Sequence, residues 1–235
     1  MNELELREPR AEVGRYGFFG RRKGHRLRQT QAGLLETLLP RLALCPQSSP
    51  AAEVSTLFVA PVSEVMLEIG SGGGEHLLAQ ALGHPQTGFI GCEPFVNGMA
   101  KTLAGIASQG LGNVRLHLGD GLAVARWLPP RCLSGCYILY PDPWPKRRHR
   151  KRRLIQDATV AILARPLRSG GFVRLATDCE DYAAWIRERF ARSSLFIVQP
   201  QLHDAAPWPD FPGTRYAKKA AEEGRRSWFL TALRV

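Results

Sequence analysis

The sequence predicts an α/β fold with a mostly parallel sheet of seven strands and helices on both faces. From Val65 onward, short apolar segments alternate with helical stretches, which is typical of parallel strands joined by helices. A glycine-rich turn at Gly70–Gly74 follows the first of these segments, and acidic residues follow several others. The length of 235 residues, with 44% hydrophobic content, is enough for one well-packed domain and short for two.

The chain is expected to consist of a basic arm followed by one domain. Residues 1–29 form a polar, basic arm and residues 30–235 a single domain, in which a helix and linker (30–60) precede the core (61–235). Leucines at helical spacing predict an amphipathic helix over Gln31–Leu44, and the linker is rich in Ser, Pro and Ala. Strands are expected at Val65–Ile69, Phe89–Glu93, Val114–Leu118, Cys136–Tyr140 and Phe172–Ala176, with two closing strands at Leu195–Val198 and Trp228–Leu233. Helices are expected at Glu75–Leu82, Phe95–Gln109, Leu122–Trp127, Arg150–Ala164 and Tyr182–Ala191.

A long loop is expected near residues 201–217. The segment His203–Ala217 is rich in proline and aromatic residues, which fits neither helical nor strand periodicity. Loops of this length in compact domains are usually functional, so this segment is a candidate part of the site.

The charge of the chain favours a polyanionic partner. A net charge of +11 and a pI near 10.0 fit nucleic acid, an anionic membrane surface, or simply a basic soluble protein. No apolar segment approaches the roughly 18 residues of a membrane span, and the first ten residues lack the apolar core of a signal peptide. We therefore expect a cytoplasmic protein without a membrane partner, a monomer by default, with a dimer left open.

The five cysteines indicate neither disulfides nor a metal site. Their number is odd, they are scattered, and several lie in apolar strand-like segments, which favours buried reduced thiols. Three residues separate Cys132 from Cys136, and no other pair of His or Cys residues completes a tetrahedral set. No metal is expected.

The segment Tyr137–Arg153, Y-I-L-Y-P-D-P-W-P-K-R-R-H-R-K-R-R, joins an apolar strand to an acidic turn and then to a cationic block. Prolines on both sides of Asp142 stop the strand there, and ligands of open α/β sheets bind outside the carboxyl ends of strands. Lys146–Arg153 places a cation at nearly every position, so a helix there is charged all round. A solvated helix face is the ordinary interpretation of such a block, but without interleaved acids it suits a polyanion better.

The arm resembles this block in composition. Arg15–Arg28 mixes Arg and Lys with glycine and aromatic residues. Two interpretations stay open, a disordered tail or an arm that becomes ordered on RNA.

The glycine turn indicates the class of cofactor. In L-E-I-G-S-G-G-G-E-H, the third glycine of a dinucleotide fingerprint would fall on Glu75, whose carboxylate would face a pyrophosphate, so an NAD site is excluded. The remaining E-x-G-x-G-x-G, Glu68–Gly74, resembles the first motif of the Rossmann-like S-adenosylmethionine-dependent methyltransferase fold. S-adenosylmethionine carries a sulfonium and an ammonium group and no phosphate, so acidic residues attract it.

Acidic residues occur at four successive strand ends. Glu93 ends the second strand, where a carboxylate can accept both ribose hydroxyls, and Asp120 and Asp142 end the next two. A single acid before a helix is more often a cap, but four at corresponding positions, with Glu68 as the first, favour a cofactor site.

The chain as a whole resembles the bacterial tRNA (guanine-N7-)-methyltransferases. The resemblance rests on G-R-R-K-G-H-R-L-R, L-E-I-G-S-G-G-G-E, G-C-E-P-F, A-T-D and T-R-Y, and most specifically on P-D-P-W-P-K followed by R-H and further cations. It implies transfer of a methyl group from S-adenosyl-L-methionine to N7 of a guanosine in the tRNA variable loop.

The resemblance also implies residue roles, with Asp142 as the catalytic residue. The implied cofactor contacts are Glu68, Gly70, Glu93, Asp120 and Asp142. The implied contacts to the guanosine are Lys146, Asp178, Thr214, Arg215 and Tyr216. The implied RNA contacts are Arg148, His149, Arg150, Lys151, Arg152 and Arg153.

The sequence departs from the family pattern at Ala217, where the family usually has Glu after Thr-x-aromatic. A carboxylate contact to guanine would then fall to Asp142 or Asp178. Two alternatives remain: methylation of another RNA base or an exocyclic amine, because P-D-P-W loosely resembles the motif of amino-group methyltransferases, and an RNA-binding protein with a relic methyltransferase fold.

Overall fold

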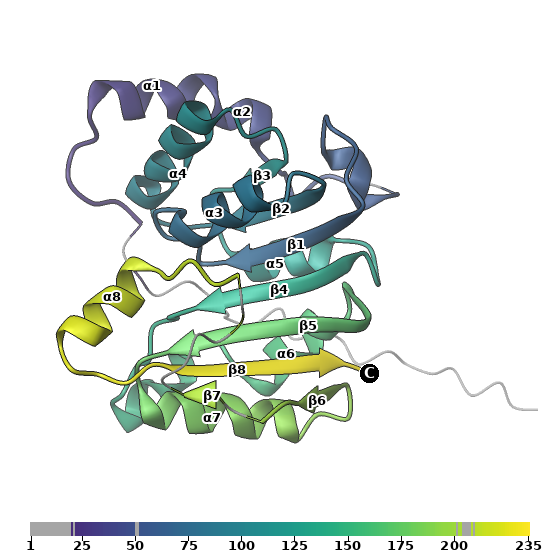
Figure 1. The fold of residues 1–235 in the computed structure, drawn as a ribbon, viewed down its shortest axis with the longest axis vertical. Coiled ribbons are helices and arrows are strands. Elements are labelled where there is room, and N and C mark those ends of the chain that lie inside the picture. The colour runs from purple at the N-terminus through teal and green to yellow at the C-terminus, as the bar shows by residue number, and fades with distance from the viewer. Residues whose placement is uncertain (1–19, 21, 50–51, 201, 204–207, 209) are drawn as a thin grey trace, which may run out of the picture.

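The computed structural model describes residues 20, 22–49, 52–200, 202–203, 208 and 210–235 (Figure 1). These residues form an eight-stranded sheet with the path β3-β2-β1-β4-β5-β8-β6, and β7 pairs with β8 beside that path. The strands are β1 (Glu64–Ile69), β2 (Thr87–Cys92), β3 (Val114–His117), β4 (Leu133–Leu139), β5 (Leu167–Thr177), β6 (Phe196–Val198), β7 (Leu202–His203) and β8 (Trp228–Arg234). The first five are parallel, and β8 is antiparallel to both β5 and β6. The seven predicted strands are confirmed, and β7 lies in the predicted loop.

Helices cover both faces of the sheet, as predicted. They are α1 (Gln29–Thr37), α2 (Leu39–Leu42), α3 (Glu75–Gly83), α4 (Val96–Gln109), α5 (Gly121–Trp127), α6 (Asp157–Ala164), α7 (Glu180–Ala191) and α8 (Arg215–Glu222), with 3₁₀ turns η1 (Val54–Leu57) and η2 (Arg147–Arg152). One apolar core joins the sheet to α5, α6 and α7. A second joins it to α3 and α4, with α1 and α2 packed outside.

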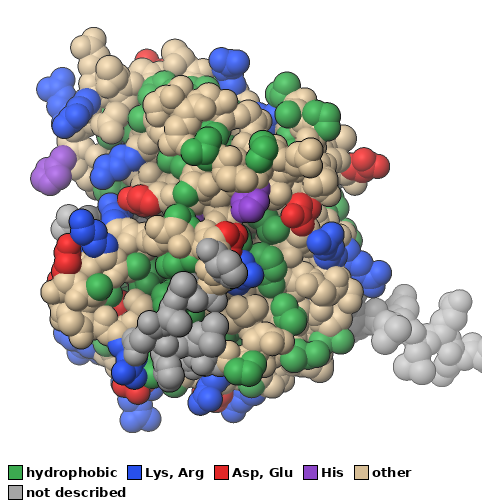
Figure 2. Space-filling model, viewed as in Figure 1, with side chains coloured by type: hydrophobic (Ala, Val, Ile, Leu, Met, Phe, Trp, Pro, Cys, Tyr) green, Lys and Arg blue, Asp and Glu red, His purple; other side chains and the backbone are tan. Residues whose placement is uncertain are grey.

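A third apolar cluster covers the sheet over β4, β5 and β8. Trp208 and Phe211, from the predicted loop, contact Phe229 with ring centroids 5.8 and 5.6 Å away. On the face drawn in Figure 2, hydrophobic side chains are visible in the region of β4, β5 and β8. Trp208 and Phe211 therefore have a structural role, and positions 201, 204–207 and 209 of the predicted loop lie outside the described residues.

Three predicted elements need correction. The helix expected over Gln31–Leu44 is divided into α1 and α2, because Pro40 lacks an N–H to continue the helical hydrogen bonds. The helix expected over Arg150–Ala164 begins only at Asp157. Helix α8 occupies the end of the predicted loop, where the Thr214 hydroxyl accepts a bond of 3.1 Å from the backbone N–H of Ala217 and caps the helix.

Candidate active site

A cavity of about 360 Å³ opens at the carboxyl ends of β1, β2, β3 and β4. Parallel strands end at one edge of a sheet, so four loops that are far apart in sequence meet there. Its lining combines these loops with η2 and α8: Gly20, Ile69, Gly70, Gly72, Glu93, Pro94, Phe95, Gly119, Asp120, Gly121, Leu122, Leu139, Tyr140, Pro141, Asp142, Trp144, Lys151, Arg152, Arg153, Leu154, Arg215 and Tyr216.

The glycine turn forms one wall of this cavity. Gly70, Gly72 and Gly74 all have positive φ, at 81°, 58° and 83°, a conformation that costs other residues energy. Helix α4 packs directly against the turn, since a Cβ atom on Gly98 would lie 2.4 Å from the carbonyl oxygen of Gly72. The conformation of the glycine turn therefore depends on the small size of Gly98 in α4.

We expect Gly98→Ala to destabilise the protein by roughly 1–3 kcal/mol, because the added methyl group forces the turn and α4 apart. Cofactor affinity should fall as well. Gly33→Ala is the matched control, because its Cβ atom meets nothing within 4 Å in α1 and the change should stabilise by about 0.5–1 kcal/mol. Urea unfolding of both variants measures the difference in their free energies of unfolding. A Gly98→Ala variant as stable as the Gly33→Ala variant would contradict this prediction.

Glu93 connects the turn to the second strand. One carboxylate oxygen accepts the backbone N–H of Gly72 at 2.6 Å and the other that of Phe95 at 2.8 Å, and the residue is 7% exposed. Burial raises the pKa of Glu93, while the two amide bonds and the charge of Arg215 oppose part of that rise. Each oxygen keeps a lone pair for a ligand hydroxyl.

Asp120 combines a cap with a position in the cavity wall. Its Oδ1 accepts the backbone N–H of Leu122 at 2.9 Å and thereby caps α5. Asp120 also lines the cavity, so its role as a helix cap does not exclude a role in ligand binding.

Glu68 does not line the cavity, although a direct cofactor contact was expected. It is 4% exposed, and its Oε2 lies 2.7 Å from Nδ1 of His76, which is itself 1% exposed. The His76 ring contacts Tyr137 edge-on, with centroids 4.5 Å apart. Glu68 and His76 flank the glycine turn in sequence, so their contact joins the two ends of the turn.

Asp142 lies in a strained turn at the end of β4. Tyr140 and Trp144 on either side have φ of 52° and 41°, which is unusual outside glycine and costs of order 1–3 kcal/mol each. Tyr140 is held by a hydrogen bond of 2.9 Å with Ser227 and by stacking on Tyr216, with centroids 6.2 Å apart. Partial burial raises the pKa of Asp142. The strand was expected to end at this residue, but β4 ends at Leu139, three residues earlier.

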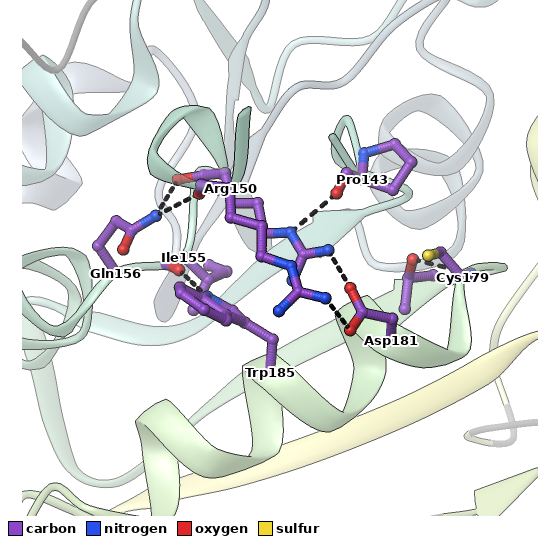
Figure 3. Close-up of polar contacts among 9 residues, drawn as sticks. Pro143, Arg150, Ile155, Gln156, Cys179, Asp181 and Trp185 are labelled. Atoms are coloured by element: carbon purple, nitrogen blue, oxygen red, sulfur yellow. Dashed lines mark hydrogen bonds and ion pairs between the residues drawn. The ribbon is translucent and has the colours of Figure 1, made fainter. Parts of the chain in front are cut away.

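The cationic block is a 3₁₀ turn rather than a helix charged all round. Its side chains divide between solvent and protein: Arg147, Arg148 and Lys151 are exposed, His149, Arg150 and Arg152 are half-buried, and Arg153 is 2% exposed. Arg150 and Arg153 both pair with Asp181 on α7 (Figure 3). The hydrogen bond from Arg153, with the charges of both arginines, lowers the pKa of Asp181. The RNA contact predicted for Arg153 is wrong, because its side chain is buried against α7.

The residues expected to contact guanosine lie in two groups. Arg215 and Tyr216 line the cavity, and Thr214 caps the helix that carries them. Lys146 and Asp178 are outside the cavity lining, and Asp178 forms an ion pair with Arg225. Sequence reasoning missed Tyr140, whose only signal was its place before the prolines.

The described part of the arm packs on α4. The carbonyl of Arg22 accepts the backbone N–H of Val96 at 3.0 Å, and Asn97 bonds both the N–H of Gly24 (2.8 Å) and the carbonyl of His25 (2.7 Å). Lys23, His25, Lys101 and Arg215 surround a second cavity there. The rest of the arm, residues 1–19 and 21, lies outside the described residues.

The described residues contain neither a candidate metal site nor a membrane-spanning helix. Within the described ranges, no three His, Cys, Asp or Glu residues are grouped so as to hold a metal ion. Nor is any helix among them long and apolar enough to cross a bilayer. Burial raises the pKa of the Cys132 thiol to about 11 and that of Cys136 further, which fits unreactive thiols.

Comparison with known proteins gives consistent results. A family described as "Putative methyltransferase" matches residues 63–230. The tRNA (guanine-N(7)-)-methyltransferase of Nitrobacter hamburgensis is 53% identical over 94% of the chain and 88% of its own length. The protein of the same name from Bradyrhizobium diazoefficiens is 48% identical over 95% of both.

Solved structures add the fold alone, because their identity is low. The 16S rRNA methyltransferase KamB has a TM-score of 0.56 at 17% identity, covering 74% of this chain and 89% of its own. The antibiotic-resistance methyltransferase Kmr has a TM-score of 0.54 at 16% identity, covering 75% and 89%. The Rossmann-like methyltransferase fold expected from the glycine turn is thereby confirmed.

Proposed function

Because the chain belongs to the tRNA (guanine-N(7)-)-methyltransferase family, we propose that it methylates N7 of a guanosine in the tRNA variable loop, using S-adenosylmethionine. The observation that carries the proposal is the cavity that brings Glu93, Asp120 and Asp142 together beside a cationic segment. This combination suits a small cationic cofactor next to a polyanionic substrate, and the reaction would take place in the cytoplasm.

The residues present fit S-adenosylmethionine. Three carboxylates face a cavity bounded by a turn of glycines, which suits a ligand with positive charge and no phosphate. Glu93 would hold the ribose, Asp120 the adenine side and Asp142 the methionine side. The bound cofactor supplies an electrophilic methyl group on a sulfonium centre.

The enzyme's own contribution is mainly orientation. Guanine N7 has an in-plane lone pair and no proton, so no general base is required to expose the nucleophile. Correct placement of two reactants is equivalent to roughly 7–11 kcal/mol in favourable systems. Tyr140, Tyr216 and Trp144 give this edge of the cavity aromatic surfaces on which a base can stack.

Charge stabilisation is the second contribution. Positive charge moves onto the purine during transfer, and its N1–H becomes more acidic. A carboxylate near the base is therefore favoured increasingly along the reaction path. We assign this role to Asp142, which lines the cavity at the end of β4; Asp178 is less suited because Arg225 already pairs with it.

RNA would lie on the exposed cations of η2 and on the arm. Arg147, Arg148 and Lys151 are exposed, and Lys151 also lines the cavity. Lys23 and Lys101 extend the positive surface along the arm and α4. Phosphate contacts of this kind fix the register of the RNA without reading its sequence.

The proposed ribose contact predicts the effect of Glu93→Ala. Loss of a charged hydrogen-bonding group should cost roughly 1.5–3 kcal/mol and raise the Kd for S-adenosylmethionine about 10- to 100-fold. The effect includes release of the Gly72 amide, so the turn loosens as well. Isothermal titration measures it directly.

Glu75→Ala is the matched control for this variant. Glu75 directly follows the glycine turn but is exposed and does not line the cavity. The cofactor affinity of the Glu75→Ala variant should therefore stay near that of the parent. tRNA affinity should be unchanged in both variants. Equal cofactor binding by the Glu93 and Glu75 variants would remove Glu93 from the site.

Methylation of unmodified tRNA with labelled cofactor tests the whole proposal. Digestion of the product should place the label on 7-methylguanosine from the variable loop. Label on another base or on an exocyclic amine would replace the proposal by the first alternative. Absence of saturable cofactor binding would favour an RNA-binding protein with a relic fold.

A further inference from the structure

The turn that carries Asp142 requires support from outside itself. Tyr140 and Trp144 both adopt positive φ, which persists only where neighbouring groups hold the backbone in place. Among the described residues, no hydrogen bond reaches the Asp142 carboxylate. The direction of this side chain therefore depends on how its backbone is fixed.

One of these supports is a buried cation. Nε of Arg153 donates to the carbonyl of Pro143, the residue after Asp142, at 2.9 Å. The Arg153 side chain is 0% exposed, and its guanidinium lies 4.9 Å from the ring centre of Tyr182 and 5.1 Å from that of Trp185. A buried arginine between two rings has few alternative positions, so it fixes the carbonyl it contacts.

Asp181 holds this cation in place. It lies in the first turn of α7, where one carboxylate oxygen pairs with Arg150 at 2.6 Å and the other with Arg153 (Figure 3). A buried charge without a partner is strongly unfavourable, so the position of Arg153 depends on this carboxylate. Asp181 itself is 47% exposed and lies outside the cavity lining.

The backbone of the cationic block is fixed to the same support. The Gln156 amide donates to the carbonyls of Arg150 and Arg153, both at 3.0 Å. The Trp185 indole donates to the carbonyl of Ile155 at 2.7 Å (Figure 3). The contacts thus form a continuous path from α7 to the turn.

We propose that Arg153 and Asp181 are positioning residues for the methyl transfer, acting through the Pro143 carbonyl on Asp142. The proposal rests on the function assigned above to this cavity. Asp181 does not touch substrate or cofactor; it keeps Arg153 under the turn, and Arg153 keeps the turn in its strained conformation. Its burial distinguishes Arg153 from the neighbouring cations, which are exposed or half-buried.

Asp181→Asn tests the proposal because two explanations of the Asp181 carboxylate predict different values of kcat. If Asp181 matters only as a negative charge on a cationic surface, its removal should strengthen tRNA binding and leave kcat unchanged. As the anchor of a positioning residue, its removal should lower kcat roughly 10- to 100-fold, with tRNA affinity equal to or above that of the parent. The Kd for S-adenosylmethionine should change less than kcat, since Glu93, Asp120 and the glycine turn still hold the cofactor.

Glu180→Gln is the matched control. Glu180 is the adjacent acid in the same first turn of α7 and is exposed, so both variants lose one negative charge at the same helix terminus. Its kcat should equal that of the parent. Asp181→Glu, which restores the charge, should recover part of the kcat lost in Asp181→Asn.

Arg153→Lys keeps the proposal testable if Asp181→Asn does not fold. It preserves a cation beside Asp181 but removes the Nε–H that bonds Pro143, so kcat should fall while cofactor binding persists. Parent-like kcat in a folded Asp181→Asn or Arg153→Lys variant would overturn the positioning role. Failure of the proposed function is distinguishable, because the parent itself would then form no 7-methylguanosine.

Discussion

Asp142→Asn is expected to lower kcat roughly 100- to 1000-fold while the protein remains folded and binds tRNA normally. The amide keeps the size of the side chain but removes the charge that stabilises the purine as it becomes cationic. Asp142→Glu should fail as well, because an added methylene displaces the carboxylate from a cavity wall set by a strained turn.

Single-turnover kinetics with saturating tRNA and cofactor measure this effect on the chemical step. Asp157→Asn is a suitable control, because Asp157 is an exposed acid at the start of α6, outside the cavity. Near-parent turnover by Asp142→Asn would leave Asp142 only a structural role.

The parent should also show a pH dependence that this variant lacks. Partial burial raises the pKa of Asp142, so the carboxylate becomes protonated at a higher pH than an ordinary Asp. Activity should therefore decline on the acidic side as pH falls through that raised pKa, whereas Asp142→Asn should be low and flat over the same range.

A combined Arg147→Ala, Arg148→Ala, Lys151→Ala variant is expected to bind tRNA roughly 100-fold more weakly near 0.15 M salt. All three cations are exposed on η2. The slope of log affinity against log salt should become shallower by roughly 2–3, because each lost phosphate contact contributes about 0.7–0.9. Unrelated tRNAs should be affected equally, and the Kd for S-adenosylmethionine should not change.

The control for this variant removes equal charge from the opposite edge of the sheet. Arg126→Ala, Arg168→Ala, Arg192→Ala changes three exposed cations at the end of α5, the start of β5 and the end of α7. Filter binding over a salt series should show a smaller loss of affinity and a smaller change of slope. Equal losses in both variants would mean that only net charge matters and that η2 is a solvated surface.

The strand ends could be predicted from sequence because their signals are local. The prolines beside Asp142 predict the end of β4, and the glycines after Ile69 predict a turn. The directions in which the side chains point could not be predicted from the sequence in the same way. Glu68 points to His76 rather than into the cavity, and nothing in the spacing of the motif distinguishes these two directions.

Arg153 illustrates the other limit. In the sequence it is one of seven Lys and Arg residues from Lys146 to Arg153, and the other six are exposed or only half-buried. Its burial is decided by Asp181, Tyr182 and Trp185, which lie 28 to 32 residues later and are brought close only by the packing of α7. Helix α8 was missed for a related reason, because its Thr214 cap follows a proline-rich stretch that predicts a loop.

The contact between the arm and α4 bears on how this part of the sequence can vary during evolution. Arg22 caps α4 through its carbonyl, a group that every amino acid has, so exchange of this side chain leaves the cap intact. Gly24 is constrained instead, because a Cβ atom there would lie 2.8 Å from the Phe95 ring. Selection on this segment should therefore preserve Gly24 and Asn97 more strictly than any single arginine. The positions of the Lys and Arg residues around Gly24 should vary more between related sequences.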